Sequence, residues 1–172
     1  PQPFFHHPTP STLTDKKQKI LREERERCFK TGAWERATSL DYVSRCGIVP
    51  KPNGKWRVTW DGRWVNTHIP KAPVRFETLK QLRLQARPGD WFFSVDLQDG
   101  YHAVAIHEDY RKFFTFDLGP QPAGQPRYIQ HSALNFGWGR SPMVFTKVMR
   151  VFVQACRRRG MRVLPLLDDV CV

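Results

Sequence analysis

The sequence lacks several features that mark common classes of protein. No stretch is long and apolar enough to span a membrane, and the N-terminus has no apolar core of a secretory signal. The 172 residues include only four cysteines, widely spaced, without a Cys-x-x-Cys pair or a histidine at metal-ligand spacing. Disulfide frameworks and zinc ribbons are therefore disfavoured, and we expect thiols in a reducing, intracellular compartment. No internal repeat is present.

Acidic residues are scarce relative to basic ones. The chain has 28 Lys and Arg against 16 Asp and Glu, which gives a formal net charge of +12. This excess indicates a polyanionic partner, and nucleic acid is the simplest candidate for a chain with interleaved aromatic residues. The alternative is a basic protein without such a role, or a basic part of a larger assembly with other proteins. With 40% hydrophobic residues, one or two compact units can form.

Changes in composition divide the chain into four segments. Residues 1–14 are rich in proline and polar side chains, and we expect an extended tether there. Residues 15–44 are expected to be a helical segment, with a charged helix from Asp15 to about Lys30. Residues 45–90 contain a predicted hairpin and a short helix near residues 74–85, and residues 91–172 contain apolar strands and a long helix.

Two acidic segments stand in apolar surroundings. Asp168 and Asp169 follow aliphatic residues, and Asp96 lies within the apolar run 91–97, which we expect to be a buried strand. A buried carboxylate is costly unless it is paired, hydrogen-bonded or metal-bound, and oxygen-only ligands favour Mg²⁺ or Mn²⁺. Two such ions about 3.5–4 Å apart stabilise the attacking and leaving oxygens of phosphoryl transfer. The alternative is that these aspartates end ordinary strands, Asp96 before a turn at Asp99-Gly100.

Residues 47–58 form a second candidate element. Pro52-Asn53-Gly54 is a turn signal between alternating apolar and basic residues, which predicts a basic hairpin. Such a hairpin is either a phosphate-binding element or a solvated surface.

A long helix is predicted from Ser141 to about Arg159. Ser141 is expected to cap it and Pro142 to take the first helical position, while Gly137 and Gly139 free the backbone just upstream. Apolar residues at helical spacing are expected to face the core: Val144, Phe145, Val148, Met149, Val151, Phe152 and Ala155.

In this order and spacing, the segments from about Arg45 to Val172 resemble the fingers and palm of reverse transcriptases. The likeness is greatest to enzymes of retrotransposons of the tyrosine-recombinase type. It implies an α+β fold, with a palm made of an antiparallel sheet backed by helices and with partial fingers, ending before the thumb. Residues 45–90 would be the fingers-like region, and residues 91–172 the palm-like region with motifs A, B and C.

The resemblance also implies roles for the acidic residues. Asp96 and Asp168 match the two metal-binding catalytic aspartates, and Asp169 is the neighbour of the second. The backbone carbonyl of Leu97 is a further metal ligand. Two Mg²⁺ or Mn²⁺ ions are the implied cofactors.

The remaining matches concern the nucleotide. Tyr101 matches the aromatic gate that rejects a 2′-hydroxyl, because a flat ring under the sugar leaves no room for it. Phe136 and Gly137 match residues that lie against the template base and the nucleotide. Three basic residues match positions that meet the triphosphate: Lys51, Lys55 and, as the best match, Arg57. Three more match a stretch that braces the fingers: Asp61, Arg63 and Asn66.

The sequence also departs from the family pattern. Leu166 stands where an aromatic residue is usual, and Asn135 where related retroelements commonly have proline. Pro165, just before Leu166, cannot donate a hydrogen bond to a ladder. The Gly/Pro-rich insert 119–126 is expected to link strands near residues 113–118 and 128–131.

Two functions of different class follow. The first is an RNA-directed DNA polymerase, which transfers nucleotides to a primer 3′-hydroxyl and binds an RNA template and a primer–template duplex. The second is a non-catalytic remnant that acts as a basic RNA-binding or structural module in a larger ribonucleoprotein. The sequence stops three residues after Asp169, and we expect no return strand there, so this span alone is not expected to extend a primer.

Overall fold

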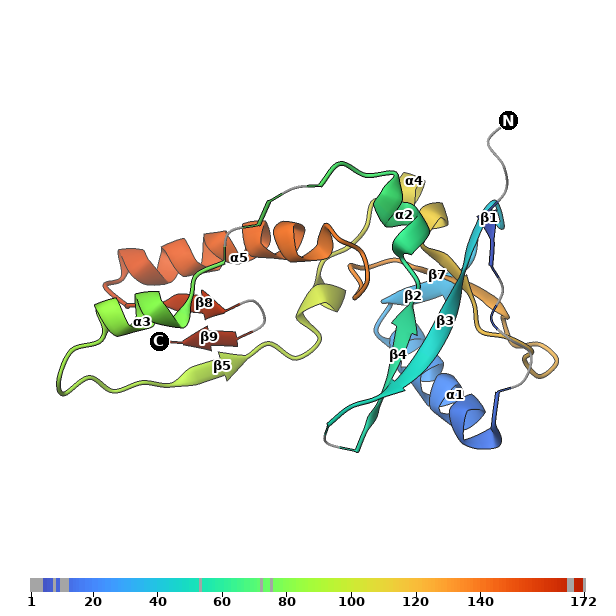
Figure 1. The fold of residues 1–172 in the computed structure, drawn as a ribbon, viewed down its shortest axis with the longest axis horizontal. Helices are drawn as coiled ribbons and strands as arrows, with labels where there is room; N and C mark the ends of the chain where they lie inside the picture. The colour runs from blue at the N-terminus through green and yellow to red at the C-terminus, as the bar shows by residue number, and fades with distance from the viewer. Residues whose placement is uncertain are drawn as a thin grey trace. The chain divides into compact units, whose positions relative to one another are not determined.

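The computed structural model describes residues 5–7, 9, 13–52, 54–71, 73–74, 76–166 and 169–171, with the backbone alone for residues 79, 82, 166 and 169 (Figure 1). They form helices and sheets in two compact units, which confirms the α+β prediction. The first unit is Pro1–Pro70 with Tyr101–Gly139, and the second is Lys71–Gly100 with Arg140–Val172. Each unit therefore combines two stretches that are distant in the sequence. The segment boundaries predicted at residues 14, 44 and 90 stay a prediction.

A six-stranded sheet forms the first unit. Its strands are β1 (Phe5–His6), β2 (Trp34–Arg36), β3 (Tyr42–Pro50), β4 (Trp56–Trp60), β6 (Thr115–Asp117) and β7 (Tyr128–His131). The order is β1-β3-β6-β7-β2, with β4 also paired to β3. Because β1 and β6 run parallel to β3, this sheet is mixed. Turn signals reveal hairpins, but they do not reveal parallel pairs between distant segments.

Both hairpins predicted in this unit are present. β3 and β4 pair antiparallel from Cys46↔Trp60 to Pro50↔Trp56, and the turn is closed by a bond from Lys51 N to Lys55 O at 2.7 Å. Asn53, in the predicted turn, lies outside the described residues. β6 and β7 flank the insert 119–126 as expected.

The N-terminal part of the chain packs on this sheet. Helix α1 (Asp15–Lys30) has the predicted bounds and buries Leu21, Arg25 and Cys28 on one face. In the predicted tether, β1 is extended and pairs with β3, and the buried Thr9 donates from its hydroxyl to Asp117 O at 2.6 Å. These described parts of the segment are therefore bound to the sheet.

Four short elements complete the first unit or border it. Their bounds are α2 (Arg63–Thr67), η1 (Gly100–Ala103), α4 (Glu108–Arg111) and η2 (Lys112–Phe114).

The second unit has a three-stranded antiparallel sheet backed by a helix, as predicted for the palm. The strand order is β5 (Ser94–Asp96), β9 (Asp169–Cys171), β8 (Leu164–Leu166). Helix α5 (Ser141–Arg158) packs on the sheet. Its Val153 and Cys156 form a buried cluster with Val163, just before β8, and Val170 of β9. Helix α3 (Leu79–Gln85) lies within the range predicted for the short helix. The expectation that the return strand is missing was wrong, since β9 pairs on both of its sides.

Two predictions about α5 also need correction. Ser141 is the first helical residue and Arg140 takes the N-cap position, where it makes no side-chain capping bond, so Ser141 does not cap the helix. Only part of the predicted apolar face is core, because Val148, Val151 and Phe152 are exposed, Val151 to 72%. A sheet of three short strands is too narrow to cover so broad a face.

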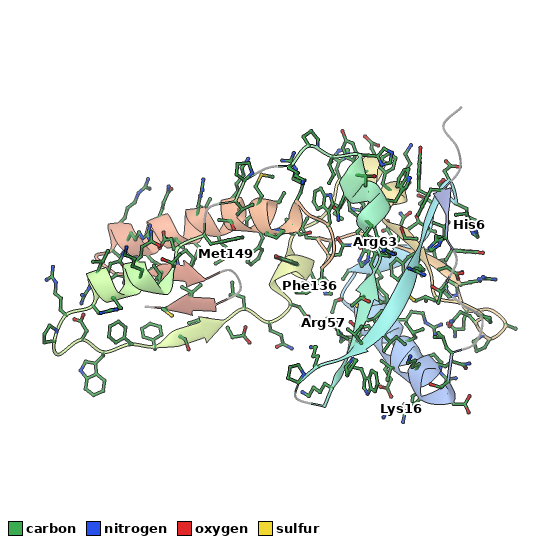
Figure 2. All side chains as sticks on the ribbon, in the orientation of Figure 1. His6, Lys16, Arg57, Arg63, Phe136 and Met149 are labelled. Carbon is green, nitrogen blue, oxygen red and sulfur yellow. The ribbon has the colours of Figure 1, made fainter. Side chains whose placement is uncertain are left out.

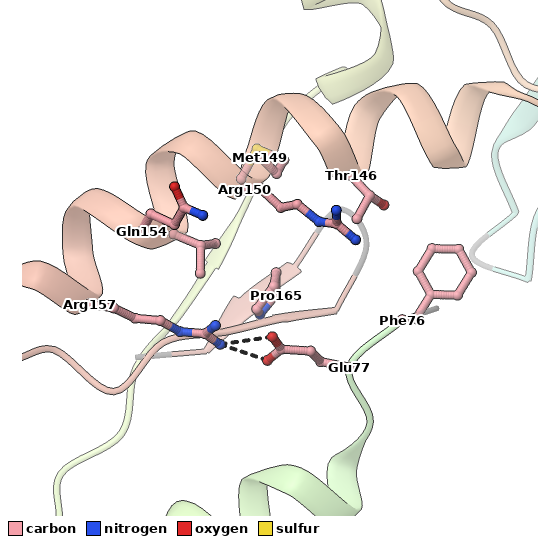
Figure 3. A pocket seen from close by; sticks show the side chains of 9 residues that line it. Phe76, Glu77, Thr146, Met149, Arg150, Gln154, Arg157 and Pro165 are labelled. Atoms are coloured by element: carbon pink, nitrogen blue, oxygen red, sulfur yellow. Dashed lines mark hydrogen bonds and ion pairs between the residues drawn. The ribbon is translucent and has the colours of Figure 1, made fainter. Parts of the chain in front are cut away.

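A pocket of about 340 Å³ lies beside α5 in the second unit (Figure 3). Phe76 and Glu77 line it from one side, and Thr146, Met149 and Arg150 of α5 from the other. Arg157 Nη2 donates to both Glu77 oxygens at 2.9 Å, which ties the segment before α3 to the long helix. The described lining of this pocket contains none of the predicted site residues.

Two further expectations concern thiols and membranes. The cysteines are present as thiols, and burial raises the pKa of Cys46 to about 11. Among the described helices, none combines the length and apolar character needed to cross a membrane.

Candidate active site

The β5–β9 pair brings two predicted site residues onto neighbouring strands. Asp96 and Asp169 are register partners, and Asp169 is also the partner of Leu166 in the β8–β9 hairpin. Asp168 lies outside the described residues, and of Asp169 only the backbone is described. The acidic segments that stand far apart in the sequence therefore meet at one end of one small sheet.

The predicted burial of the strand at residues 91–97 is wrong. All three β5 residues are exposed, and the preceding Trp91 is exposed to 95%. β5 lies at the edge of the sheet with β9 as its neighbour, and an apolar run does not by itself reveal which strand is central. The cost of burial is therefore no argument for a cation at Asp96 in this chain.

The backbone after β5 turns immediately. Leu97 O accepts a hydrogen bond from Gly100 N at 3.3 Å, and Asp99 has φ +53°, in the left-handed region. Asp96 is thus the last residue of a strand before a turn, as the alternative reading expected. Within the described ranges, no cluster of three or more His, Cys, Asp or Glu side chains has the geometry of a metal site.

Three residues predicted to meet the nucleotide come together in the first unit. The Arg57 guanidinium lies over the Phe136 ring, 5.4 Å from its centroid (Figure 2). The Phe136 ring lies 4.8 Å from the Tyr101 ring at an interplanar angle of 37°. Tyr101 is buried at 4% exposure, whereas Phe136 stays 47% exposed. The three side chains form a stack in which the Tyr101 ring is tilted and Phe136 stays half exposed.

The predicted basic residues of the hairpin flank a hollow. Lys51 and Arg57 line a pocket of about 230 Å³ with Val49, Pro50 and Pro52. Lys55 is exposed near the turn between the strands. Two of the three cations expected to bind phosphate thus border one concave surface on the hairpin.

Asp61 joins the hairpin to α2. Its carboxylate accepts bonds from Arg63 Nη2 at 2.6 Å and from Arg45 Nε of β3 at 3.3 Å. The hydrogen bonds from Arg63 are the largest cause that lowers the pKa of Asp61 well below its usual range. The ion pair holds the start of α2 against the end of β4.

Asn66 of α2 contacts the turn that precedes α5. Its Nδ2 donates to Gly137 O at 2.7 Å, and its Oδ1 accepts from Gly139 N at 2.8 Å. Gly137 has φ +111°, as expected for a glycine that frees the backbone. Sequence reasoning assigned Asn66 to bracing and missed this contact, because no local pattern links residues 71 positions apart.

Comparisons with known proteins identify a family for most of the chain. The model of the family described as reverse transcriptase (RNA-dependent DNA polymerase) matches residues 49–172. The Gag-Pol polyprotein of Bovine immunodeficiency virus (strain R29) is 24% identical over 128 residues, which cover 73% of this chain and 9% of that protein. The Gag-Pro-Pol polyprotein of Bovine leukemia virus (isolate Australian) is 29% identical over 104 residues, with coverage of 59% and 7%. The chain spans less than a tenth of either relative.

Solved structures share the fold. The native Prototype Foamy Virus protease-reverse transcriptase superposes with a TM-score of 0.75 at 20% identity, covering 99% of this chain and 21% of that one. The foamy viral protease-reverse transcriptase dRH in complex with double-stranded DNA gives a TM-score of 0.72 at 21% identity, covering 98% and 27%.

Proposed function

The chain belongs to the reverse transcriptase (RNA-dependent DNA polymerase) family, and from this premise we propose that it is the fingers and palm portion of an RNA-directed DNA polymerase. In the reaction, a primer 3′-hydroxyl attacks the α-phosphate of a deoxynucleoside triphosphate; a phosphodiester bond forms, the bond between the α- and β-phosphates breaks, and pyrophosphate and the hydroxyl proton leave. The observation that carries this proposal is the register that pairs Asp96 with Asp169. It supports a site in which motifs A and C act together, while their assignment to a retrotransposon of the tyrosine-recombinase type rests on sequence likeness.

The donor set fits a hard divalent cation. Acidic residues at directly paired positions repel each other, and a cation relieves that repulsion. The Asp96 carboxylate makes no hydrogen bond or ion pair with other described residues, so it is available to a ligand. In the proposal, Asp96, Asp168 and the Leu97 carbonyl hold two Mg²⁺ or Mn²⁺ ions, which when bound neutralise charge on the attacking and leaving oxygens.

The stack in the first unit is proposed to receive the nucleotide. Arg57 and Lys51 bind the triphosphate as cations on one hollow surface. Phe136, which is 47% exposed between Arg57 and Tyr101, is the member of the stack that a nucleotide base can contact. Tyr101, fixed by its burial against Phe136, excludes a 2′-hydroxyl by its position.

The net charge of +12 supports nucleic acid as the macromolecular partner, both as RNA template and as primer–template duplex. The same charge favours the second candidate function, a non-catalytic RNA-binding or structural module in a ribonucleoprotein. Pro165 does not decide between the two, because β8 is an edge strand, where proline is tolerated.

The test uses Asp96→Asn in a polypeptide that includes residues 1–172 and whatever segments accompany them in the native protein. We expect Mg²⁺-dependent incorporation to fall by more than ~100-fold, because several kcal/mol of charge stabilisation are lost. RNA binding should persist and weaken with salt, with a slope of about 0.9 per phosphate on a duplex. Glu108→Gln, which removes an exposed carboxylate from α4, is the matched control and should leave both properties unchanged.

Retained incorporation in Asp96→Asn would contradict the catalytic proposal. An unvaried protein that binds RNA without incorporating nucleotide would support the non-catalytic module.

A further inference from the structure

We infer that Asn66 is a positioning residue for the nucleotide site. Its side-chain amide bonds to the backbone of the turn at residues 137–139. This turn follows Phe136 directly and thereby keeps the Phe136 ring between Arg57 and Tyr101. This inference rests on the proposed function and assigns to α2 a part in substrate selection.

The amide is matched to the turn on both of its atoms. The carbonyl of Gly137 accepts from the amide nitrogen at 2.7 Å, and the N–H of Gly139 donates to the amide oxygen at 2.8 Å. Among short side chains, only a carboxamide carries a donor and an acceptor side by side. An aspartate keeps the acceptor but presents an oxygen to Gly137 O, and a leucine of similar size offers neither.

Of the three residues of the turn, Trp138 packs its ring edge-on against Phe114 at 5.3 Å, and the amide of Asn66 adds an anchor at the two glycines. Gly137 and Gly139 carry no side chain, and glycine loses more conformational freedom on ordering than any other residue. Phe136, just before them, is half exposed, so packing alone does not fix its ring. The turn also lies against Trp60, since a Cβ on Gly137 would come within 2.9 Å of Trp60 O. This close approach leaves little room for the turn to shift without breaking the Asn66 bonds.

Helix α2 connects this anchor to the hairpin that carries Arg57. Asp61 bonds to Arg63 at the start of α2 and to Arg45 of β3, the strand paired with β4. A chain of contacts therefore runs from the strands that present Arg57, through α2, to the turn that follows Phe136. A change at Asn66 should loosen the Phe136 end of this chain of contacts and leave the Arg57 end in place.

The test compares Asn66→Asp and Asn66→Leu with Thr67→Ala in the full polypeptide. Thr67 is exposed on the same helix, and its hydroxyl bonds to Trp64 O within α2, so this control removes a local bond without touching the turn. Two readouts are measured: hydrogen exchange of a peptide spanning residues 136–141, and steady-state incorporation of deoxynucleotides and ribonucleotides.

We expect Asn66→Leu to speed exchange at the turn and both Asn66 variants to raise KM for deoxynucleotide about fivefold, which corresponds to the net value of one hydrogen bond, about 1 kcal/mol, between groups that water can reach. As KM rises, the preference for deoxynucleotide over ribonucleotide should fall, while kcat changes less than about twofold. Thr67→Ala should match the unvaried protein in KM and in preference.

The outcomes separate the levels of the argument. Unchanged hydrogen exchange in Asn66→Leu would show that the amide does not hold the turn. Faster exchange with unchanged KM and unchanged sugar preference would show that the turn does not position the nucleotide site. Either result overturns the inference. A fall in kcat and thermal stability alone, with KM unchanged, would indicate a merely structural role and also overturns it. If the unvaried protein neither binds nor incorporates deoxynucleotide, the proposed function itself fails, and the inference with it.

Discussion

Lowering the pH should destabilise the protein through His131, which lies in the aromatic core of the first unit. Its ring stacks on Phe116 at 4.8 Å and meets Trp34 and Trp60 edge-on, each at 5.8 Å. His131 is 4% exposed, and neither ring nitrogen has a hydrogen-bond partner among the described residues. Burial, and secondarily the charge of nearby His102, lowers the pKa of His131 to about 3.

The sign follows from the difference between the two states. In the unfolded chain the imidazole titrates at a pKa of about 6.5, so below that pH the unfolded state takes up a proton that the folded state refuses. The free energy of unfolding therefore falls as pH drops from about 6.5 toward 3, by up to about 1.4 kcal/mol per pH unit. Between about pH 7.5 and pH 5 the loss from His131 alone is about 2 kcal/mol.

The assay is urea unfolding followed by tryptophan fluorescence at about pH 7.5 and about pH 5. His131→Phe is the control, because it keeps a ring stacked on Phe116 and removes the titrating nitrogens. Carboxyl groups such as Asp61 contribute little in this window, which lies above their unfolded pKa of about 4. Stability of the unvaried protein should fall by about 2 kcal/mol more than that of His131→Phe. Parallel losses in the two proteins would refute the reasoning.

Two further substitutions test close contacts in the first unit. Gly62→Ala should lower the free energy of unfolding by about 1–3 kcal/mol, because a Cβ there would lie 2.4 Å from the Trp60 ring and 2.6 Å from Gly137 O. A urea midpoint equal to that of the unvaried protein would contradict this close approach. Arg127→Met should cost about 2–3 kcal/mol, because it leaves the fully buried Asp117 carboxylate with backbone donors in place of a bidentate guanidinium. A loss of unfolding free energy below about 0.5 kcal/mol would contradict the expectation that the Asp117 carboxylate depends on Arg127.

Elements with strong local signals could be predicted from the sequence. The charged helix has the expected bounds at Asp15 and Lys30, with an acidic first turn and a basic last turn. The β3–β4 hairpin follows from its turn residues and from the alternation of its strands. The start of α5 was displaced by one residue, because Ser141 and Pro142 carry the signal of a helix start without showing which of them is the cap.

Burial in the second unit could not be predicted in the same way. The run from Trp91 to Val95 has the composition of a central strand, yet β5 is an edge strand and its residues are exposed. Composition records how apolar a segment is, whereas burial depends on how many neighbours the sheet supplies. The same limit applies to α5, whose apolar face is broader than the sheet it covers.

The candidate site residues came from the likeness to a family, and the structure adds contacts between distant segments that no local pattern could give. The glycine turn before α5 illustrates this point. The sequence predicts conformational freedom of the backbone at Gly137. A site that positions a nucleotide needs a backbone that is held in one conformation. That constraint comes from outside the motif, through the amide of Asn66 and the close backbone of Trp60. The glycine permits the turn to come close enough to be held, and the amide holds it, so the two features are useful only together.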